Sequence, residues 1–211
     1  QLRLLNYIRL FANGLQKVGG SALLVSNFKA FSGCTSLTSI TIPDSVTLIG
    51  IAAFYYCTSL LEITIPNSVT SIDGWTFANC KSLENVIIGD SVTSIGDFAF
   101  SGCRSLTSII IPDSVTSIDK YAFSNCDSLT DVYFNGTKEE WNEIYIDNVD
   151  NRCLTNANIH FIERNGWVEK NGKWAYYENG VKLTNQWKAD SQGWCYLGAD
   201  GYMVTNKWVA D

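Results

Sequence analysis

The most constraining feature of the chain is a phrase of 23 residues that repeats through its middle. Its period is marked by five cysteines at one repeat position, Cys34, Cys57, Cys80, Cys103 and Cys126. The first copy reads AFSGCTSLTSITIPDSVTLIG, and the fourth, AFSGCRSLTSIIIPDSVTSID, differs from it at few positions. One such unit is too short to bury its own apolar side chains, so successive units must stack on one another.

Within each unit the apolar positions alternate as they do in a short strand. In the first unit Ile40 and Ile42 fall on one face, while Ser39 and Thr41 fall on the other. A proline follows in three copies and ends the strand. The core pattern Leu-x-x-Ile-x-Ile at this period predicts a leucine-rich-repeat solenoid of the α/β horseshoe class. We expect a right-handed coil with a parallel sheet along one wall and short strands or irregular arcs along the other.

The five regularly spaced cysteines allow two structural interpretations. Neighbouring thiols in a ladder point in parallel, which is poor geometry for a disulfide. Metal binding needs ligands that converge, and no CxxC-like spacing is present. We therefore expect a buried column of small apolar side chains and predict no metal site and no cofactor. Cys153 and Cys195 have no evident partner in the sequence.

The outward strand positions form rows that are one period apart. One row becomes apolar toward its C-terminal end, through Ile87, Ile110 and Tyr133. An exposed isoleucine on a strand often reflects β-propensity alone. A contiguous apolar strip of this kind is also typical of a docking surface for a partner. The sequence leaves both interpretations open.

The chain divides into three segments. Residues 1–29 have apolar positions at helical spacing and predict a cap on the open end of the coil, with a membrane-surface segment or signal remnant as the alternative. Residues 30–163 hold the repeats and a closing cap, in which Thr137 to Glu140 fits a capping box and Asn158 to Ile162 reads as a last strand. Residues 164–211 have a different composition. Both ends look cut, so we expect a processed or excised piece.

The repeat segment resembles the BspA-like leucine-rich repeat family of bacterial surface proteins. The phrase AFxxC-x-SLTSI-x-IPDSVTSI and the closing GTKEEWNEI…ANIHF segment carry the resemblance, which covers about two-thirds of the chain. The resemblance implies an exported, non-enzymatic surface protein that often acts as an adhesin.

From Gly166 aromatic residues alternate with Gly, Asn and Asp, which predicts short hairpins with tight turns. The stretch GWVEKNGKWAYYENGVKL is similar to the choline-binding type of cell-wall-binding repeat. That similarity implies aromatic cages that hold choline on teichoic acids, or wall sugars in some relatives. Motif position assigns Trp167, Trp174 and Tyr196 to one cage and Trp187 and Trp194 to a second. The same rings could instead only pack the hairpins together.

Composition narrows the function. With 21 acidic and 15 basic residues the net charge is −6, which argues against nucleic acid as a partner. The sequence contains no run of about 18 apolar residues, which is the length that would predict a membrane span. One histidine and no GxSxG or HExxH motif argue against an enzyme. We expect a secreted protein of the cell surface or wall that binds wall choline or polysaccharide through its hairpins and a host protein or glycan through its solenoid. A spacer, or a targeting fragment of a larger secreted wall-active enzyme, is the alternative.

Overall fold

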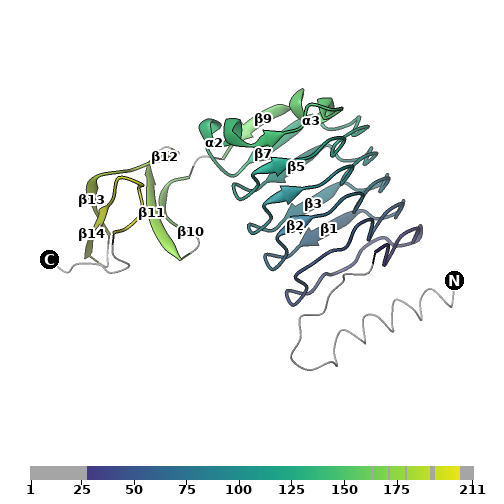
Figure 1. Ribbon diagram of the computed structural model, residues 1–211, viewed down its shortest axis with the longest axis horizontal. Coiled ribbons are helices and arrows are strands. Elements are labelled where there is room, and N and C mark those ends of the chain that lie inside the picture. Colours follow the sequence, from purple (N-terminus) through teal and green to yellow (C-terminus); the bar gives the residue numbers. More distant parts are fainter. Residues whose placement is uncertain (1–27, 163, 171, 179, 191–192, 205–211) are drawn as a thin grey trace.

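The computed structural model describes residues 28–162, 164–170, 172–178, 180–190 and 193–204. The chain forms a stack of flattened coils followed by a smaller group of antiparallel strands (Figure 1). The two parts join beside helix α2 (Lys138–Glu143). The cap expected at residues 1–29 lies outside the described residues except for its last two positions.

Two parallel walls build the stack. The front wall consists of four-residue strands: β1 (Glu62–Ile65), β3 (Asn85–Ile88), β5 (Ser108–Ile111), β7 (Asp131–Phe134) and β9 (Asn158–Phe161). The rear wall consists of two-residue strands: β2 (Ser71–Ile72), β4 (Ser94–Ile95), β6 (Ser117–Ile118) and β8 (Tyr145–Ile146). Each strand pairs in parallel with the equivalent strand of an adjacent layer. Ile63 thus lies opposite Val86, and Ile72 lies opposite Ile95. The predicted parallel sheet opposite short-strand arcs is confirmed.

Two details differ from the expected coil. In the described part of the stack, helices occur only in the closing layers, so turns rather than helices face the front sheet in the repeats. The strand expected around Ser39 to Ile42 is not formed as regular structure, although the Leu61 amide still donates to the Thr38 carbonyl at 3.0 Å. Ile40 and Ile42 are only partly buried there, because among the described residues this layer has a neighbour on one side only.

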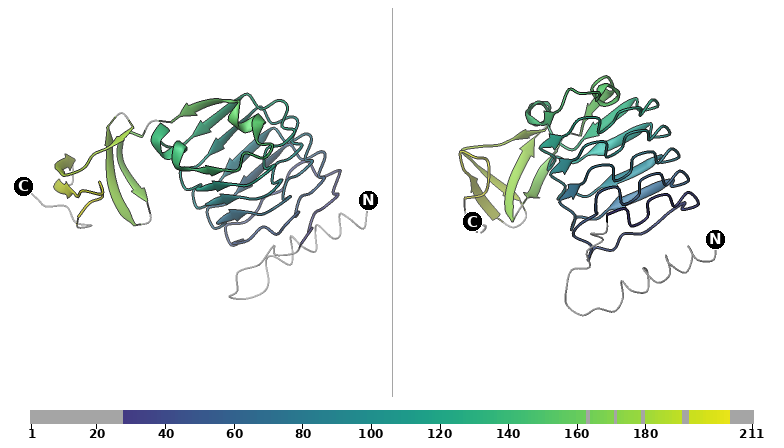
Figure 2. Two further views of the ribbon diagram at one scale, coloured as in Figure 1. Left: turned by 45° about the horizontal axis from the view of Figure 1, so that its top comes forward. Right: turned by 45° about the vertical axis from the view of Figure 1, so that its right-hand side comes forward.

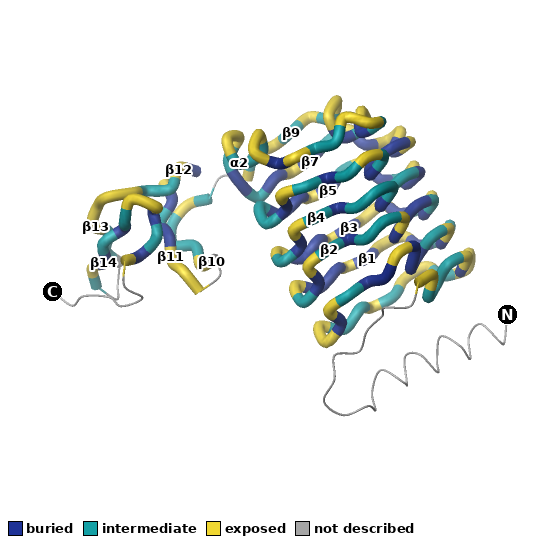
Figure 3. Tube along the Cα trace, viewed as in Figure 1, coloured by how far each residue is buried: buried dark blue, intermediate teal, exposed yellow. Residues whose placement is uncertain are grey.

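Each layer adds a phenylalanine and a cysteine to one continuous interior. In Figure 3 the buried positions of the layers are dark blue. The rings of Phe31, Phe54, Phe77, Phe100 and Phe123 stack with centroids 5.1–5.4 Å apart and planes within 17° of parallel. Four of the five repeat thiols donate to the carbonyl oxygen of the phenylalanine 26 residues earlier, at 3.1–3.3 Å. All five are free and at most 7% exposed. The predicted column of buried thiols is confirmed.

One turn position in each layer has a left-handed backbone and carries an aromatic ring in three of them. Trp75, Phe98 and Tyr121 have φ of 62°, 58° and 60°, where a bulky residue costs about 1–2 kcal/mol. Their rings stack at 4.1 and 4.5 Å, and such aromatic pairs contribute about 0.5–1.5 kcal/mol each. The stacked rings therefore offset part of the backbone strain at this corner of the coil.

In the closing layers, side chains form hydrogen bonds that a further repeat would otherwise form with the last one. Thr137 accepts from the Glu140 amide at 3.2 Å, and Glu140 accepts from the Thr137 amide at 2.9 Å, so the predicted capping box at α2 is confirmed. Asn151, which precedes α3 (Arg152–Thr155), is 1% exposed. Its amide donates to the Asp119 and Asp147 carbonyls and its oxygen accepts from the Phe123 amide, so it replaces contacts that a further repeat would make.

The C-terminal part is built from antiparallel strands, seen from two further sides in Figure 2. β10 (Gly166–Lys170) pairs with β11 (Lys173–Glu178), which pairs with β12 (Val181–Lys182), and β13 (Gln186–Asp190) pairs with β14 (Gly193–Leu197). The segment after β14 returns to the first pair, where the Met203 amide donates to the Trp174 carbonyl at 2.7 Å. Cys195, Leu197 and Met203 form a small core with Trp167, Tyr176 and Leu183.

The buried thiols predict how stability depends on pH. Burial raises the pKa of Cys57, with a further rise from Cys34, to about 12 from 9.0. Burial likewise raises the pKa of Cys126 to about 12. Because the folded pKa lies above the unfolded value, this stabilisation is complete below about pH 9 and is lost as pH rises toward 12. Each such thiol contributes a slope of about 1.4 kcal/mol per pH unit.

We predict that Cys57→Ala makes this alkaline loss of stability shallower by about 1.4 kcal/mol per pH unit. Urea unfolding followed by circular dichroism between about pH 9 and pH 11 measures the slope. Val92→Ala is the control, because Val92 is fully buried and does not titrate. It should lower the free energy of unfolding without altering the slope. A wild-type slope in Cys57→Ala would contradict the prediction.

Candidate functional surfaces

The front wall carries the apolar strip that the sequence predicts. Ile87, Ile110 and Tyr133 lie on β3, β5 and β7 and are 60%, 44% and 37% exposed. Alternation along the strands turns their neighbours Val86, Ile109 and Val132 into the core. The ring of Tyr133 stacks on His160 of β9 at 4.7 Å, and His160 Nε2 lies 2.7 Å from Asp131 Oδ1. The three residues are adjacent on one open sheet face.

A hollow of about 500 Å³ borders this strip between the turns that follow β1 and β3. Gly89 stands where three other repeats have proline. A Cβ at this glycine would lie 2.7 Å from Asn67 Oδ1 and 2.8 Å from the Ile65 carbonyl. The glycine therefore permits the close approach of two turns, and the Asp90 amide donates to Asn67 Oδ1 at 2.8 Å there.

The hairpin registers group the aromatic residues by strand pair. Trp167 lies opposite Tyr176, and Glu169 lies opposite Trp174, so these side chains share one face of the first pair. The rings of Trp167 and Tyr176 meet edge to face at 5.0 Å. The sequence places Tyr196 in a cage with Trp167 and Trp174, whereas the register puts Tyr176 beside them.

The second strand pair repeats this arrangement. Trp187 lies opposite Tyr196 with ring centroids 5.4 Å apart, and Trp194 lies opposite Ala189 on the same face. Trp187 and Trp194 are 55% and 42% exposed. Cys195 and Leu197 of β14 point to the other side and join the small core that holds Trp167. Tyr196 therefore belongs with Trp187 and Trp194, while any third hairpin that completes their cage lies outside the described residues.

Lysine side chains of this chain lie over two of the tyrosine rings. The Lys188 ammonium is 4.2 Å from the Tyr176 centroid and forms an ion pair with Glu178. Its hydrogen bond with Glu178 raises the pKa of Lys188. Lys182 lies 4.4 Å from the centroid of Tyr202. These contacts are cation–π interactions, in which a cation lies over an aromatic face.

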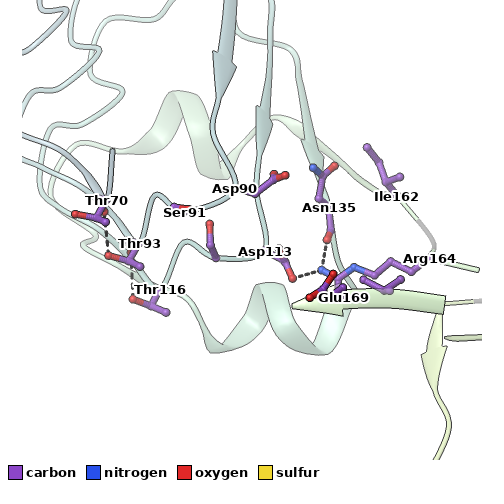
Figure 4. A pocket seen from close by; sticks show the side chains of 12 residues that line it. Thr70, Asp90, Ser91, Thr93, Asp113, Thr116, Asn135, Ile162, Arg164 and Glu169 are labelled. Carbon is purple, nitrogen blue, oxygen red and sulfur yellow. Dashed lines mark hydrogen bonds and ion pairs between the residues drawn. The ribbon is translucent and has the colours of Figure 1, made fainter. Parts of the chain in front are cut away.

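A third candidate surface is a cleft of about 970 Å³ between the stack and β10 (Figure 4). The turns of the repeats contribute Asp90, Ser91, Asp113 and Ser114 and a column of threonines, Thr70, Thr93 and Thr116. The connection and β10 contribute Ile162, Arg164, Val168 and Glu169. The cleft is thus lined by both parts of the molecule, and most of its lining residues have polar side chains.

Arg164 fastens the two parts together at the end of this cleft. Its guanidinium forms an ion pair with Asp113, donates to the Asn135 carbonyl, and donates to the Tyr177 hydroxyl at 3.1 Å. Glu140 of α2 lies 3.6 Å away. Burial lowers the pKa of Arg164, but the Asp113 and Glu140 carboxylates raise it, and the net pKa is raised. Both terminal nitrogens of this guanidinium thus face groups of the protein.

Sequence reasoning missed Arg164 and Tyr176. Arg164 follows the last predicted strand at a change of composition and belongs to no repeat, so the sequence holds no signal for its contact with Asp113. For Tyr176, in contrast, the sequence does contain a signal of its pairing with Trp167. If Asn171-Gly172 forms the tight turn, counting back along both strands pairs Trp167 with Tyr176.

Neither a metal cluster nor a membrane helix occurs in the described residues. No group of three or more His, Cys, Asp or Glu side chains in them is arranged to hold a metal ion. No helix among them has the length and apolar character to cross a bilayer.

Comparison with known proteins finds similarity in the repeats. The family model described as BspA type leucine rich repeat region matches residues 26–151 in six copies. A leucine-rich repeat protein of T. pallidum is 37% identical with a TM-score of 0.53, covering 56% of this chain and 54% of that one. One from Bacteroides ovatus is 27% identical with a TM-score of 0.39, covering 59% and 42%.

A leucine-rich repeat protein from Bacteroides capillosus is 32% identical with a TM-score of 0.41, covering 54% of this chain and 86% of that one. The chain therefore spans about half the length of the T. pallidum protein and less than half of the Bacteroides ovatus one. No curated protein sequence matches the chain.

We predict that Arg164→Gln releases the strands from the stack. The change leaves the mostly buried Asp113 carboxylate without its guanidinium, which costs about 3 kcal/mol. Limited proteolysis of the connection around Asn165 should accelerate at least about tenfold, while the melting temperature of the stack changes little. Arg104→Gln is the control, because its ion pair with Asp127 is exposed. Equal cleavage rates in the two variants would contradict the role of Arg164 in holding the C-terminal strands against the stack.

Proposed function

Because the chain belongs to the BspA-type leucine-rich repeat family, we propose that it is a non-enzymatic recognition protein of a bacterial cell surface. The solenoid has the fold of leucine-rich repeat surface proteins. In this proposal the front wall binds a partner protein of the host, and the C-terminal strands attach the molecule to the cell wall. The observation that carries the proposal is the exposed apolar strip on the front wall.

The strip has the composition of an interface centre. Parallel sheets are normally covered on both faces, yet Ile87, Ile110 and Tyr133 are exposed on an open one. Polar residues of the neighbouring row, Asn85, Ser108 and Asp131, border the strip. An apolar, aromatic centre within a polar rim is the usual anatomy of a protein–protein interface, and this favours a protein partner over a glycan.

The attachment to the wall rests on the exposed indoles of the second strand pair. Trp187 and Trp194 offer flat apolar rings on one face beside Tyr196. Rings of this kind bind a quaternary ammonium through their π faces and also stack on sugars. On the first strand pair the ammonium of Lys188 already lies over Tyr176, so a choline there would have to displace it. This contact favours a wall glycan as the ligand of the first pair.

We predict that Ile110→Lys weakens binding to the partner. A charge at the centre of the strip should cost at least about 2 kcal/mol, or about 30-fold in Kd. The measurement is surface plasmon resonance against a panel of purified host matrix proteins and host glycans. Thr64→Lys is the matched control, because Thr64 occupies the same row outside the apolar strip. If Ile110→Lys binds every ligand of the unchanged protein equally well, the role of the strip is refuted. If the unchanged protein binds only glycans in the panel, a protein partner is refuted.

We predict that Trp187→Ala combined with Trp194→Ala lowers co-sedimentation with purified cell walls by at least about tenfold. Trp75→Ala is the control, because Trp75 is also exposed and Ala52 occupies its place one layer earlier. Titration with choline, followed by tryptophan fluorescence, then separates the ligands. Wall binding with no response to choline indicates a glycan. Wall binding that survives loss of both indoles would refute attachment through these rings.

A further inference from the structure

The cleft between the stack and β10 has an excess of negative charge. Three carboxylates, Asp90, Asp113 and Glu169, line it against the single guanidinium of Arg164. Arg164 is engaged by Asp113, Glu140, Tyr177 and the Asn135 carbonyl. Among the described residues, Asp90 and Glu169 form no ion pair, and both are exposed to the cleft. An anionic ligand is therefore disfavoured, and a ligand that carries positive charge is favoured.

Three hydroxyl groups of the cleft donate their protons to backbone carbonyls of the protein. Thr93 donates to the Thr70 carbonyl and Thr116 to the Thr93 carbonyl, each at 3.1 Å, as the dashed lines in Figure 4 show. Ser114 donates to the Val92 carbonyl at 2.6 Å. Each hydroxyl has one proton, so these oxygens have only lone pairs left for a ligand. The cleft thus offers carboxylates and hydroxyl acceptors to a ligand that is rich in hydrogen-bond donors.

These acceptors recur at the layer spacing of the solenoid. Thr70, Thr93 and Thr116 occupy one position in successive layers, as do Asp90 and Asp113. Adjacent layers of paired strands are separated by about 4.8 Å. In an extended β-1,4-linked pyranose chain alternate sugars are turned over, so like groups recur on one side every two sugars, which is about two layer spacings. An extended peptide points side chains the same way only every two residues, about 6.7 Å, and is out of step with the layers.

The opposite wall of the cleft complements such a chain. β10 contributes Val168, an apolar surface for a pyranose face, and Glu169, which lies on the other face of the strand but also borders the cleft and offers a carboxylate to an amino group. The volume of about 970 Å³ lies in the range of known small-ligand sites. Because Arg164 fixes β10 against the stack, both walls are held in place before a ligand arrives.

We infer that this cleft binds a linear 1,4-linked amino-sugar chain that carries free ammonium groups. The hydroxyls and ammonium groups of the sugar donate to the threonine and serine oxygens and to Asp90 and Glu169. The cleft shares Asp90 and Asn135 with the hollow beside the apolar strip, and none of the exposed indoles lines it.

Isothermal titration calorimetry with the full chain tests the inference, using three probes of equal length: a 1,4-linked glucosamine oligomer, its N-acetylated form and a 1,4-linked glucose oligomer. The glucosamine oligomer should bind, and its affinity should fall as salt is added. The two uncharged oligomers should bind at least about fivefold more weakly. Equal affinity for all three, or no binding of the glucosamine oligomer, would overturn the inference.

Charge-neutralising variants locate the site. Asp90→Asn and Glu169→Gln should each weaken glucosamine-oligomer binding about fivefold. Asn67 occupies the position of Asp90 one layer earlier, so Asp90→Asn keeps a side chain that this turn already accepts. The matched controls Asp127→Asn and Glu84→Gln remove the same charge from exposed sites outside the cleft. Equal weakening by the controls would show non-specific attraction and overturn the inference.

Two further measurements separate sugar binding in the cleft from peptide binding there and from sugar binding on another surface. If oligolysine binds as tightly as the glucosamine oligomer, and Asp90→Asn and Glu169→Gln weaken its binding equally, the cleft binds a basic peptide. That result would overturn the inference of a sugar ligand. Tyr133→Lys, which changes the strip outside both hollows, and the double indole variant should leave glucosamine-oligomer binding unchanged. Loss of binding in those variants would place the sugar elsewhere and overturn the inference. The outcome is therefore independent of whether the strip or the indoles bind their own partners.

Discussion

The structure depends on a register that repeats without error through the core of the stack. Each Phe ring lies on the ring of the next layer at 5.1–5.4 Å, and the interior thiols donate to the carbonyl of the phenylalanine one layer earlier. Both contacts require that every layer contain the same number of residues between its Phe and its Cys. A single inserted residue would move a thiol off its carbonyl and turn the front strand over, so the period of 23 is a packing constraint.

The same constraint aligns whatever the turns carry on the outside. Side chains at one repeat position form columns, and the columns differ in chemistry from one side of the coil to the next. Trp75, Phe98 and Tyr121 form an aromatic column, Ile87 and Ile110 an apolar one, and Thr93 and Thr116 a column of hydroxyls. Substitutions in these columns leave the interior unchanged, so a solenoid can alter its surfaces while the buried register is kept.

The limits of sequence reasoning follow from the same division. The buried thiols, the parallel sheet and the capping box at Thr137 could be predicted, because periodicity and local motifs determine them. The contact of Arg164 with Asp113 could not, because it joins a repeat to a segment that shares no period with it. The grouping of Tyr176 with Trp167 depends on hairpin register, which the composition of the strands alone leaves undetermined.

Arg164 then determines how the surfaces relate to one another. Its ion pair with Asp113 takes a carboxylate out of the cleft and leaves Asp90 and Glu169 as the exposed acceptors. The same contact holds β10 beside the threonine column, so the cleft exists only while the two parts remain docked. A ligand that bridges Glu169 and the stack would bind the docked state alone and would therefore stabilise it. Binding in the cleft and docking of the C-terminal strands are thus coupled through one side chain, whereas the apolar strip on β3, β5 and β7 lies within the stack and needs no such docking.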